Sequence, residues 1–145
     1  MGLAEMRRVS QRQVVLTWDP RVRATRFWFT RDYLPQALDR ELGLASVEQV
    51  TDALGPSARV IPVSLAPDCT DGFYAAYWAR PAAYLDAKVR AGISVLALLE
   101  PSLVADALQR LESDLSSGVW EARNRDLRTL RAFDAGYRLV VAGAP

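Results

Sequence analysis

Two carboxylates and one thiol share the short turn-rich segment 67–72. Asp68 and Asp71 stand three residues apart, so the pair could act as a general base or bind a cation. Aspartates in such loops otherwise form Asx turns, and that alternative stays open here. Cys69 would need a neighbouring base and a lowered pKa to act as a nucleophile. Because the chain has no histidine, we do not expect this role for Cys69.

Trp18 and Asp19 come at the end of a strand predicted at 13–18. In open α/β sheets, ligands bind beyond the carboxyl ends of the strands, so both side chains could line a pocket. The alternative is that Trp18 packs in the core and that Asp19 caps a turn.

Arg31, Asp32 and Tyr33 follow the aromatic residues 27–29 and could orient a polar substrate. The alternative is a solvated helix start, in which Asp32 lies near the positive end of the helix dipole. We interpret the whole segment 21–33 as a loop that leads into a short helix.

Aromatic side chains recur at helical spacing between 73 and 84, and Arg80 lies among them. They could form a lid over a substrate, or they could bury their area in the core, as such stripes generally do. A run of arginines at 123–131 includes one acidic residue, Asp126. No helix-turn-helix pattern accompanies this run, so we interpret it as a solvated helix face and not as a nucleic-acid site.

Three predicted strands must position these side chains, at 13–18, 59–65 and 137–142. The first is apolar at consecutive positions, which is typical of a strand buried on both faces. Pro62 lacks a backbone donor, so it predicts a sheet edge or a bulge for the second strand. Nothing in the sequence obviously pairs with the far side of the first strand, which indicates part of a larger α/β sheet.

Helices are predicted between these strands. A capping-box pattern, Ser46 with Gln49, starts a helix that ends at Leu54. An apolar stripe makes 101–117 the clearest amphipathic helix. Further helical segments are predicted at 3–9, 73–79 and 120–131.

Composition narrows the class of protein. The 145 residues are 50% hydrophobic and 24% charged, which predicts a single globular domain over 1–145. With 18 basic and 17 acidic residues the net charge is +1, so neither nucleic acid nor a membrane is an expected partner. One cysteine allows no intrachain disulfide, and no apolar run approaches the ~20 residues of a membrane span. We therefore expect a cytoplasmic protein.

Several segments, in their order along the chain, resemble the C-terminal half of a class I S-adenosylmethionine-dependent methyltransferase of the bacterial type 11 kind. Segments 3–9 and 14–20 are similar to the helix before the fifth strand of that fold and to the strand itself. Segments 27–35 and 68–73 are similar to stretches near the substrate, and 134–142 is similar to the final antiparallel strand. The family's Pro-Gly turn before the fifth strand is absent here.

The resemblance implies an α/β fold, the last three strands of a partial Rossmann-like sheet with several packed helices. The glycine-rich turn by which the family binds S-adenosylmethionine is absent, and the first four strands would precede Met1. We therefore expect a fragment, a misassigned start or a truncated relative. No cofactor or metal is expected to bind this chain alone.

The resulting hypothesis is the substrate-side portion of a methyltransferase that acts on an unknown small molecule and is inactive alone. The residues expected to bind the substrate are Trp18, Asp19, Arg31, Asp32, Tyr33, Asp68, Asp71 and Arg80. One alternative is a non-catalytic interaction module, in which a second copy or a complementing chain covers the first strand. Another is a small ligand-binding domain that uses the aromatic segment 73–84.

Overall fold

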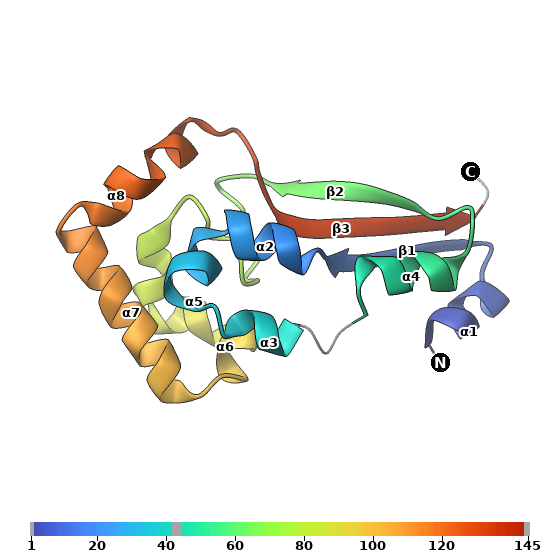
Figure 1. Ribbon diagram of the computed structural model, residues 1–145, viewed down its shortest axis with the longest axis horizontal. Helices are drawn as coiled ribbons and strands as arrows, with labels where there is room; N and C mark the ends of the chain where they lie inside the picture. The colour runs from blue at the N-terminus through green and yellow to red at the C-terminus, as the bar shows by residue number, and fades with distance from the viewer. Residues whose placement is uncertain (1, 42–44, 144–145) are drawn as a thin grey trace.

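The computed structural model describes residues 2–41 and 45–143, which form a mixed α/β fold around a three-stranded sheet. The strands are β1 (Arg12–Trp18), β2 (Arg59–Leu65) and β3 (Phe133–Gly143). The last strand in sequence, β3, lies in the middle and pairs antiparallel with both neighbours. It follows that β1 and β2 run in the same direction and form the two edges of the sheet (Figure 1).

Helices gather on one face and at one end of the sheet (Figure 1). They are α1 (Gly2–Val9), α2 (Pro20–Arg26), α3 (Ala37–Glu41), α4 (Val47–Leu54), α5 (Ala87–Ala91), α6 (Ser94–Ala97), α7 (Pro101–Ser116) and α8 (Val119–Asn124). A π-helical turn occupies Phe29–Tyr33, and 3-10 turns occupy Pro81–Leu85 and Arg125–Thr129.

Most of the predicted elements are confirmed. The predicted capping box is present: the Ser46 hydroxyl accepts from the Gln49 amide at 3.1 Å, and the Gln49 side chain accepts from the Ser46 amide at 2.8 Å. Pro62 does lie on an edge strand. The helix predicted at 73–79 is wrong, because this segment forms successive turns. The predicted loop at 21–33 is also wrong in part, because α2 begins directly after β1.

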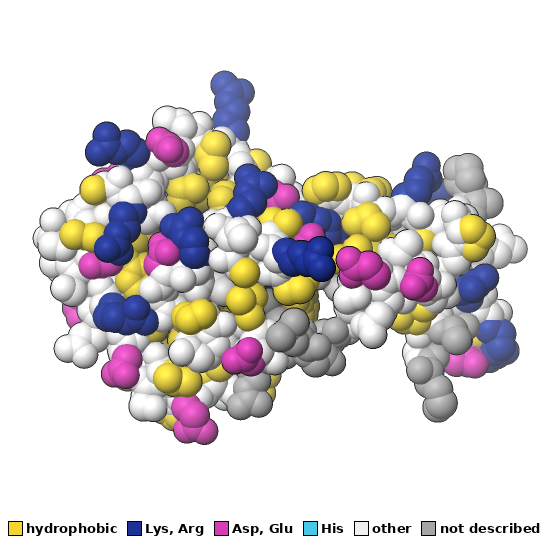
Figure 2. Space-filling model, in the orientation of Figure 1, with side chains coloured by type: hydrophobic (Ala, Val, Ile, Leu, Met, Phe, Trp, Pro, Cys, Tyr) yellow, Lys and Arg dark blue, Asp and Glu magenta, His cyan; other side chains and the backbone are white. Residues whose placement is uncertain are grey.

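Two hydrophobic cores hold these elements together. The larger core is rich in aromatic residues and joins the segment 27–34 after α2, the turns at 73–85, α7 and α8 to the first residues of β3. The smaller core packs Val50 and Leu54 of α4 against Val140 and Ala142 of β3. In the space-filling view the molecule has a larger and a smaller lobe, and hydrophobic side chains are visible at the surface between the two lobes (Figure 2).

The second face of the sheet is apolar and uncovered by the described residues. Leu16, Leu139 and Ile61 lie opposite one another across the three strands, and Leu16 and Ile61 are 61% and 47% exposed. Val14 is 58% exposed beside the half-buried Val141. We call these five side chains the bare face. The prediction that β1 is buried on both faces is therefore wrong for this chain, because α1 and α4 cover only one of them.

Asp134 links the start of β3 to its neighbours. Burial by itself would raise the pKa of the Asp134 carboxyl group. Hydrogen bonds from the Arg138 guanidinium (2.8 Å) and the Gly136 amide (2.9 Å), with the positive charges of Arg138 and Arg26, outweigh burial and lower the pKa. A lowered folded-state pKa stabilises the fold above the unfolded-state pKa of aspartate, ~3.9, and this stabilisation is lost as the pH falls through the folded-state value.

We expect Asp134→Asn to lower the free energy of unfolding by about 1 kcal/mol near pH 7, because charge-assisted hydrogen bonds are lost at a site that water still reaches. Urea unfolding of both proteins near pH 7 and again in acid, below the lowered folded-state pKa, measures the effect. The two proteins should converge in acid, where Asp134 itself is protonated. A deficit that stays constant with pH would contradict the role of the charge.

Candidate functional site

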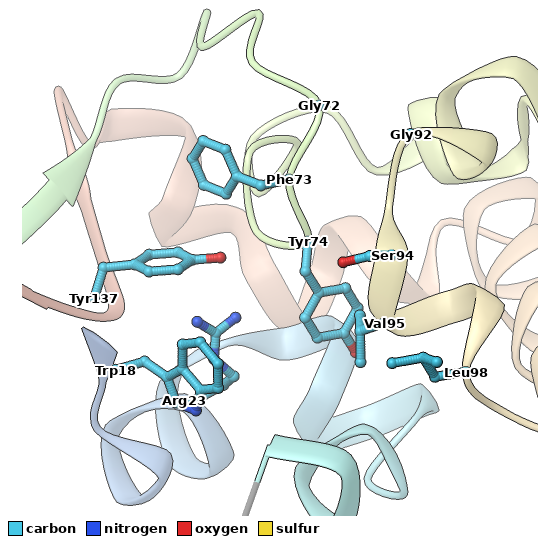
Figure 3. Close-up of a pocket in the computed structure, with 10 residues that line it drawn as sticks. All are labelled: Trp18, Arg23, Gly72, Phe73, Tyr74, Gly92, Ser94, Val95, Leu98 and Tyr137. Atoms are coloured by element: carbon cyan, nitrogen blue, oxygen red, sulfur yellow. The ribbon is translucent and has the colours of Figure 1, made fainter. Parts of the chain in front are cut away.

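Two adjoining hollows lie at the end of the sheet where β1 stops. The first, of ≈ 270 Å³, is lined by Trp18, Arg23, Tyr74 and Tyr137, together with the other residues labelled in Figure 3, and we call it the arginine pocket. The second, of ≈ 880 Å³, is lined by Leu16, by the segment after β2 and by Asp71, and we call it the loop hollow. The two share Gly72, Phe73, Gly92 and Tyr137, so they form one continuous candidate site.

A tight junction between β1, α2 and β3 positions the floor of the arginine pocket. Asp19 caps α2, because its carboxylate accepts from the amides of Arg21 at 2.9 Å and Val22 at 3.2 Å. Pro20 occupies the first turn, where it costs no hydrogen bond. The Asp19 amide donates to the Gly136 carbonyl at 2.6 Å. These contacts start the helix at the edge of the site and place Arg23 beneath it.

Arg23 is fully buried, and its guanidinium lies among aromatic rings. Its central carbon is 4.5 Å from the ring centroid of Tyr137, 5.7 Å from that of Tyr74 and 6.0 Å from that of Trp18. Such contacts stabilise a cation by the negative faces of the rings. Among the described residues, those lining the arginine pocket include no carboxylate. The pocket therefore combines apolar walls with a positive charge at its floor.

The walls of the arginine pocket are held rigidly. Burial raises the pKa of Tyr84, so its hydroxyl stays protonated and donates to the Tyr74 carbonyl at 2.7 Å. The Tyr74 hydroxyl accepts from the Thr30 hydroxyl at 3.2 Å, which fixes the other end of that ring. Phe73 meets Tyr137 edge to face, with ring centroids 5.2 Å apart. A ligand would thus meet preformed ring surfaces.

The predicted site residues do not all lie together. Trp18 lines the arginine pocket and Asp71 lines the loop hollow. Asp19 acts as the cap of α2. Asp68 is exposed on the same loop, outside the lining of both hollows. Arg80 lies 4.9 Å from the Tyr77 ring, and its guanidinium donates to the Cys69 carbonyl, so it braces the loop.

The other three predicted residues lie in the π-helical turn at Phe29–Tyr33, which contacts α7. The Arg31 guanidinium donates two hydrogen bonds to the Asp32 carboxylate, each 2.7 Å long. The Tyr33 hydroxyl donates to Asp114 of α7 at 2.7 Å. Burial, and then this hydrogen bond, raises the pKa of Tyr33. None of the three lines either hollow, so their contacts here are structural.

Sequence reasoning missed Arg23 and Tyr137 as site residues. The signal for Arg23 was the pair Asp19-Pro20, since an aspartate followed by proline is a typical helix start. Had α2 been placed there, Arg23 would have stood one turn into a helix at the carboxyl end of a strand. Tyr137 carried no such signal, because its role depends on β3 returning between β1 and β2.

The described residues 2–41 and 45–143 include no cluster of carboxylates and thiols placed to hold a metal ion. The same residues contain no helix that is long and apolar enough to span a bilayer.

Comparison with known proteins gives a structural likeness over nearly the whole chain. No protein family and no curated protein was found to match the chain. A crystal structure from Anabaena variabilis ATCC 29413, of a protein named "Putative methyltransferase from antibiotic biosynthesis pathway", matches 98% of the chain at 33% identity with a TM-score of 0.86. The chain spans 59% of the length of that protein. The likeness to a methyltransferase predicted from the sequence is thereby confirmed at the level of the fold, which is methyltransferase-like.

Proposed function

We propose that this chain forms the acceptor-binding side of an S-adenosylmethionine-dependent methyltransferase that acts on a small molecule. The observation that carries the proposal is the match to the Anabaena protein, which extends over 98% of the chain at 33% identity. The position of the hollows, beyond the end of β1, supports it as well, because α/β enzymes bind ligands at such strand ends.

The arginine pocket does not fit the methyl donor. S-adenosylmethionine carries a carboxylate, but its positive sulfonium lies only a few bonds away, so a donor bound in this small pocket would bring the sulfonium close to the positive Arg23. The volume of the arginine pocket, ≈ 270 Å³, is moreover just below the ~300–1,000 Å³ usual for small-molecule sites. A pocket of this volume is too small for a nucleoside joined to an amino acid. We therefore assign the pocket to the methyl acceptor and place the donor site on a segment outside these residues.

Positioning is the main contribution that this chain would make to methyl transfer. Transfer requires the acceptor atom to be aligned with the donor methyl group, and a protein gains most of its rate by fixing that alignment. Trp18, Phe73 and Tyr137 would hold the acceptor between ring faces, and their apolar surface would exclude water. The reacting atom would then face the loop hollow, which opens from the same rings.

The bare face is where we place the donor-binding segment. About two fifths of the Anabaena protein lies outside the match, which is enough for a donor-binding half. Leu16 belongs both to the bare face and to the lining of the loop hollow. A segment packed on Leu16, Ile61 and Leu139 would therefore bury their apolar area and close the loop hollow at the same time.

A non-catalytic interaction module is the second candidate, favoured by the exposure of Val14 and Leu16 on the edge strand β1. A second copy of the chain could cover this surface without any donor site. This reading predicts a stable homo-oligomer that does not bind S-adenosylmethionine.

Binding of S-adenosylhomocysteine separates the two candidates. We would isolate the protein from its source cells with its natural partners, measure its intact mass, and titrate it with S-adenosylhomocysteine by calorimetry. The proposal expects binding by the isolated assembly and none by the 145-residue chain alone. Absence of binding by the assembly would overturn the methyltransferase proposal.

A charge on the bare face tests the place of the donor segment. We expect Leu16→Glu to abolish binding of S-adenosylhomocysteine by the assembly, because a carboxylate would be buried against the donor segment. The matched control is Val9→Glu, since Val9 is 67% exposed at the end of α1 and lies off the sheet. Equal binding by the two variants would contradict this placement.

A further inference from the structure

We propose that the arginine pocket recognises an acid: a small, flat, apolar molecule whose carboxylate or similar oxyanion lies above Arg23. This inference rests on the proposed function in one respect, that the bound molecule is the methyl acceptor. The binding of an acid itself stands on the pocket alone.

Charge is the first step of the argument. The arginine guanidinium is a cation, so the floor of the pocket carries a positive charge. Arg23 is fully buried, and no carboxylate is among the described residues lining the pocket. In surroundings of low polarity this charge is weakly screened, so an anion is favoured there over a neutral or cationic molecule.

Two hydroxyl groups supply the second step. The Ser94 and Tyr137 hydroxyls point toward the middle of the pocket from opposite sides, and the Arg23 guanidinium lies near the Tyr137 hydroxyl (Figure 3). Hydroxyls donate to carboxylate oxygens, and hydrogen bonds to a charged group are stronger than neutral ones. The charge of Arg23 would act from beneath the Tyr137 ring, while the hydroxyls would make the direct contacts.

Size and shape set the rest of the ligand. Val95 and Leu98 of the segment around α6 oppose Trp18 across the pocket, so the walls are apolar and partly flat (Figure 3). A volume of ≈ 270 Å³ limits the occupant to about one aromatic ring with its substituents. An aromatic carboxylic acid meets both requirements.

The test compares an acid with its uncharged counterpart. We would titrate the protein with 4-hydroxybenzoate and with 4-hydroxybenzamide, following tryptophan fluorescence, since Trp18 lines the pocket. The two probes have the same shape and differ in charge. We expect the acid to bind at least tenfold more tightly than the amide, because one charge-assisted hydrogen bond changes affinity by about that factor. Equal affinity, or no binding of either probe at about 10 mM, would overturn the proposal.

Variants show whether Arg23 causes the preference. Arg23→Met keeps an unbranched apolar stem and removes the charge, so the preference for the acid should disappear, whereas Arg23→Lys should keep part of it. The matched control is Arg128→Met, because Arg128 also lies over an aromatic ring, 5.2 Å from Trp120, but outside the pocket. An unchanged preference in a folded Arg23→Met protein would overturn the proposal.

A second variant keeps the test decisive if Arg23→Met does not fold. Ser94 is exposed, so Ser94→Ala should fold and should weaken the acid about threefold to tenfold while leaving the amide nearly unchanged. An equal effect on both probes would overturn the proposal. Binding of S-adenosylhomocysteine is measured separately, so loss of the acid preference and loss of the methyltransferase assignment are distinguishable outcomes.

Discussion

Replacing Trp28 with alanine should lower the free energy of unfolding by about 3–5 kcal/mol, the usual cost of deleting a buried aromatic side chain. Trp28 is fully buried at the centre of the larger core, and its indole N–H donates to the Trp78 carbonyl at 2.8 Å. Its ring meets Tyr84 at 5.6 Å and Trp120 at 5.2 Å between centroids, nearly perpendicular to both. The change would leave a cavity and an unpaired buried carbonyl together.

This loss should reach the arginine pocket. Trp28 supports Tyr84, and the Tyr84 hydroxyl holds the Tyr74 carbonyl on the pocket wall. Because small domains are stable by only about 5–15 kcal/mol, Trp28→Ala should leave a large part of the protein unfolded at 37 °C. Chemical unfolding followed by circular dichroism measures the effect.

Trp28→Phe is the matched control, because it keeps a ring in the core and removes the hydrogen bond to Trp78. It should cost about 1–3 kcal/mol, clearly less than the alanine variant. If Trp28→Ala destabilises by less than about 1 kcal/mol, the central place of Trp28 in the core is contradicted.

The sequence predicts an element well where the interactions that form it join residues only a few positions apart. The capping box of Ser46 and Gln49 involves atoms three residues apart, so the start of α4 follows from the sequence alone. The strand at 59–65 and its edge position follow from β-branched residues and from Pro62, which cannot donate. These predictions need no knowledge of the rest of the molecule.

Predictions fail where burial depends on distant segments. The apolar run of β1 indicates a strand buried on both faces, yet Val14 and Leu16 are exposed. Whether a strand face is buried depends on which segments pack against it, and the strand's own residues do not specify those segments. The aromatic spacing at 73–79 fits a helix, but the rings of this segment instead pack in a series of turns against the core. Hydrophobic pattern alone cannot separate these outcomes.

The candidate site shows the same division. Trp18 was placed at the site from its position at a strand end, which is a rule about topology. Arg23 and Tyr137 come together only because β3 returns between the two edge strands and brings Gly136 against Asp19. The sequence separation between these residues carries no local signal of that contact. The polar residues 31–33 looked suited to a substrate, but Arg31 pairs with Asp32. The Asp32 carbonyl and the Tyr33 hydroxyl bond to α7, whose residues lie 78 and 81 positions away in the sequence.

The place where Gly136 meets Asp19 leads to a second large expected effect. Gly136 has a φ of +93°, and a Cβ atom there would lie 2.8 Å from the Asp19 carbonyl oxygen and 3.2 Å from the Arg23 amide nitrogen. Both neighbours are backbone atoms, which cannot turn aside as a side chain can. We expect Gly136→Ala to lower the free energy of unfolding by about 2–4 kcal/mol, from backbone strain and steric conflict together.

Gly118→Ala separates these two causes. Gly118 has a φ of +77°, but a Cβ atom there would meet nothing within 4 Å. This variant should lose only the backbone term, about 1–2 kcal/mol. Urea unfolding of both variants beside the wild-type protein measures the difference, and equal losses would contradict a steric conflict at Gly136.

Ligand binding extends the comparison to the site. In Gly136→Ala the start of α2 must move away from β3, which would carry Arg23 away from Tyr137 and weaken the preference for 4-hydroxybenzoate over its amide. Gly118 lies between α7 and α8, and that turn is remote from the junction of β1, α2 and β3 (Figure 1), so Gly118→Ala should keep the preference. A folded Gly136→Ala protein with the full preference would mean that the junction of β1, α2 and β3 does not set the position of Arg23.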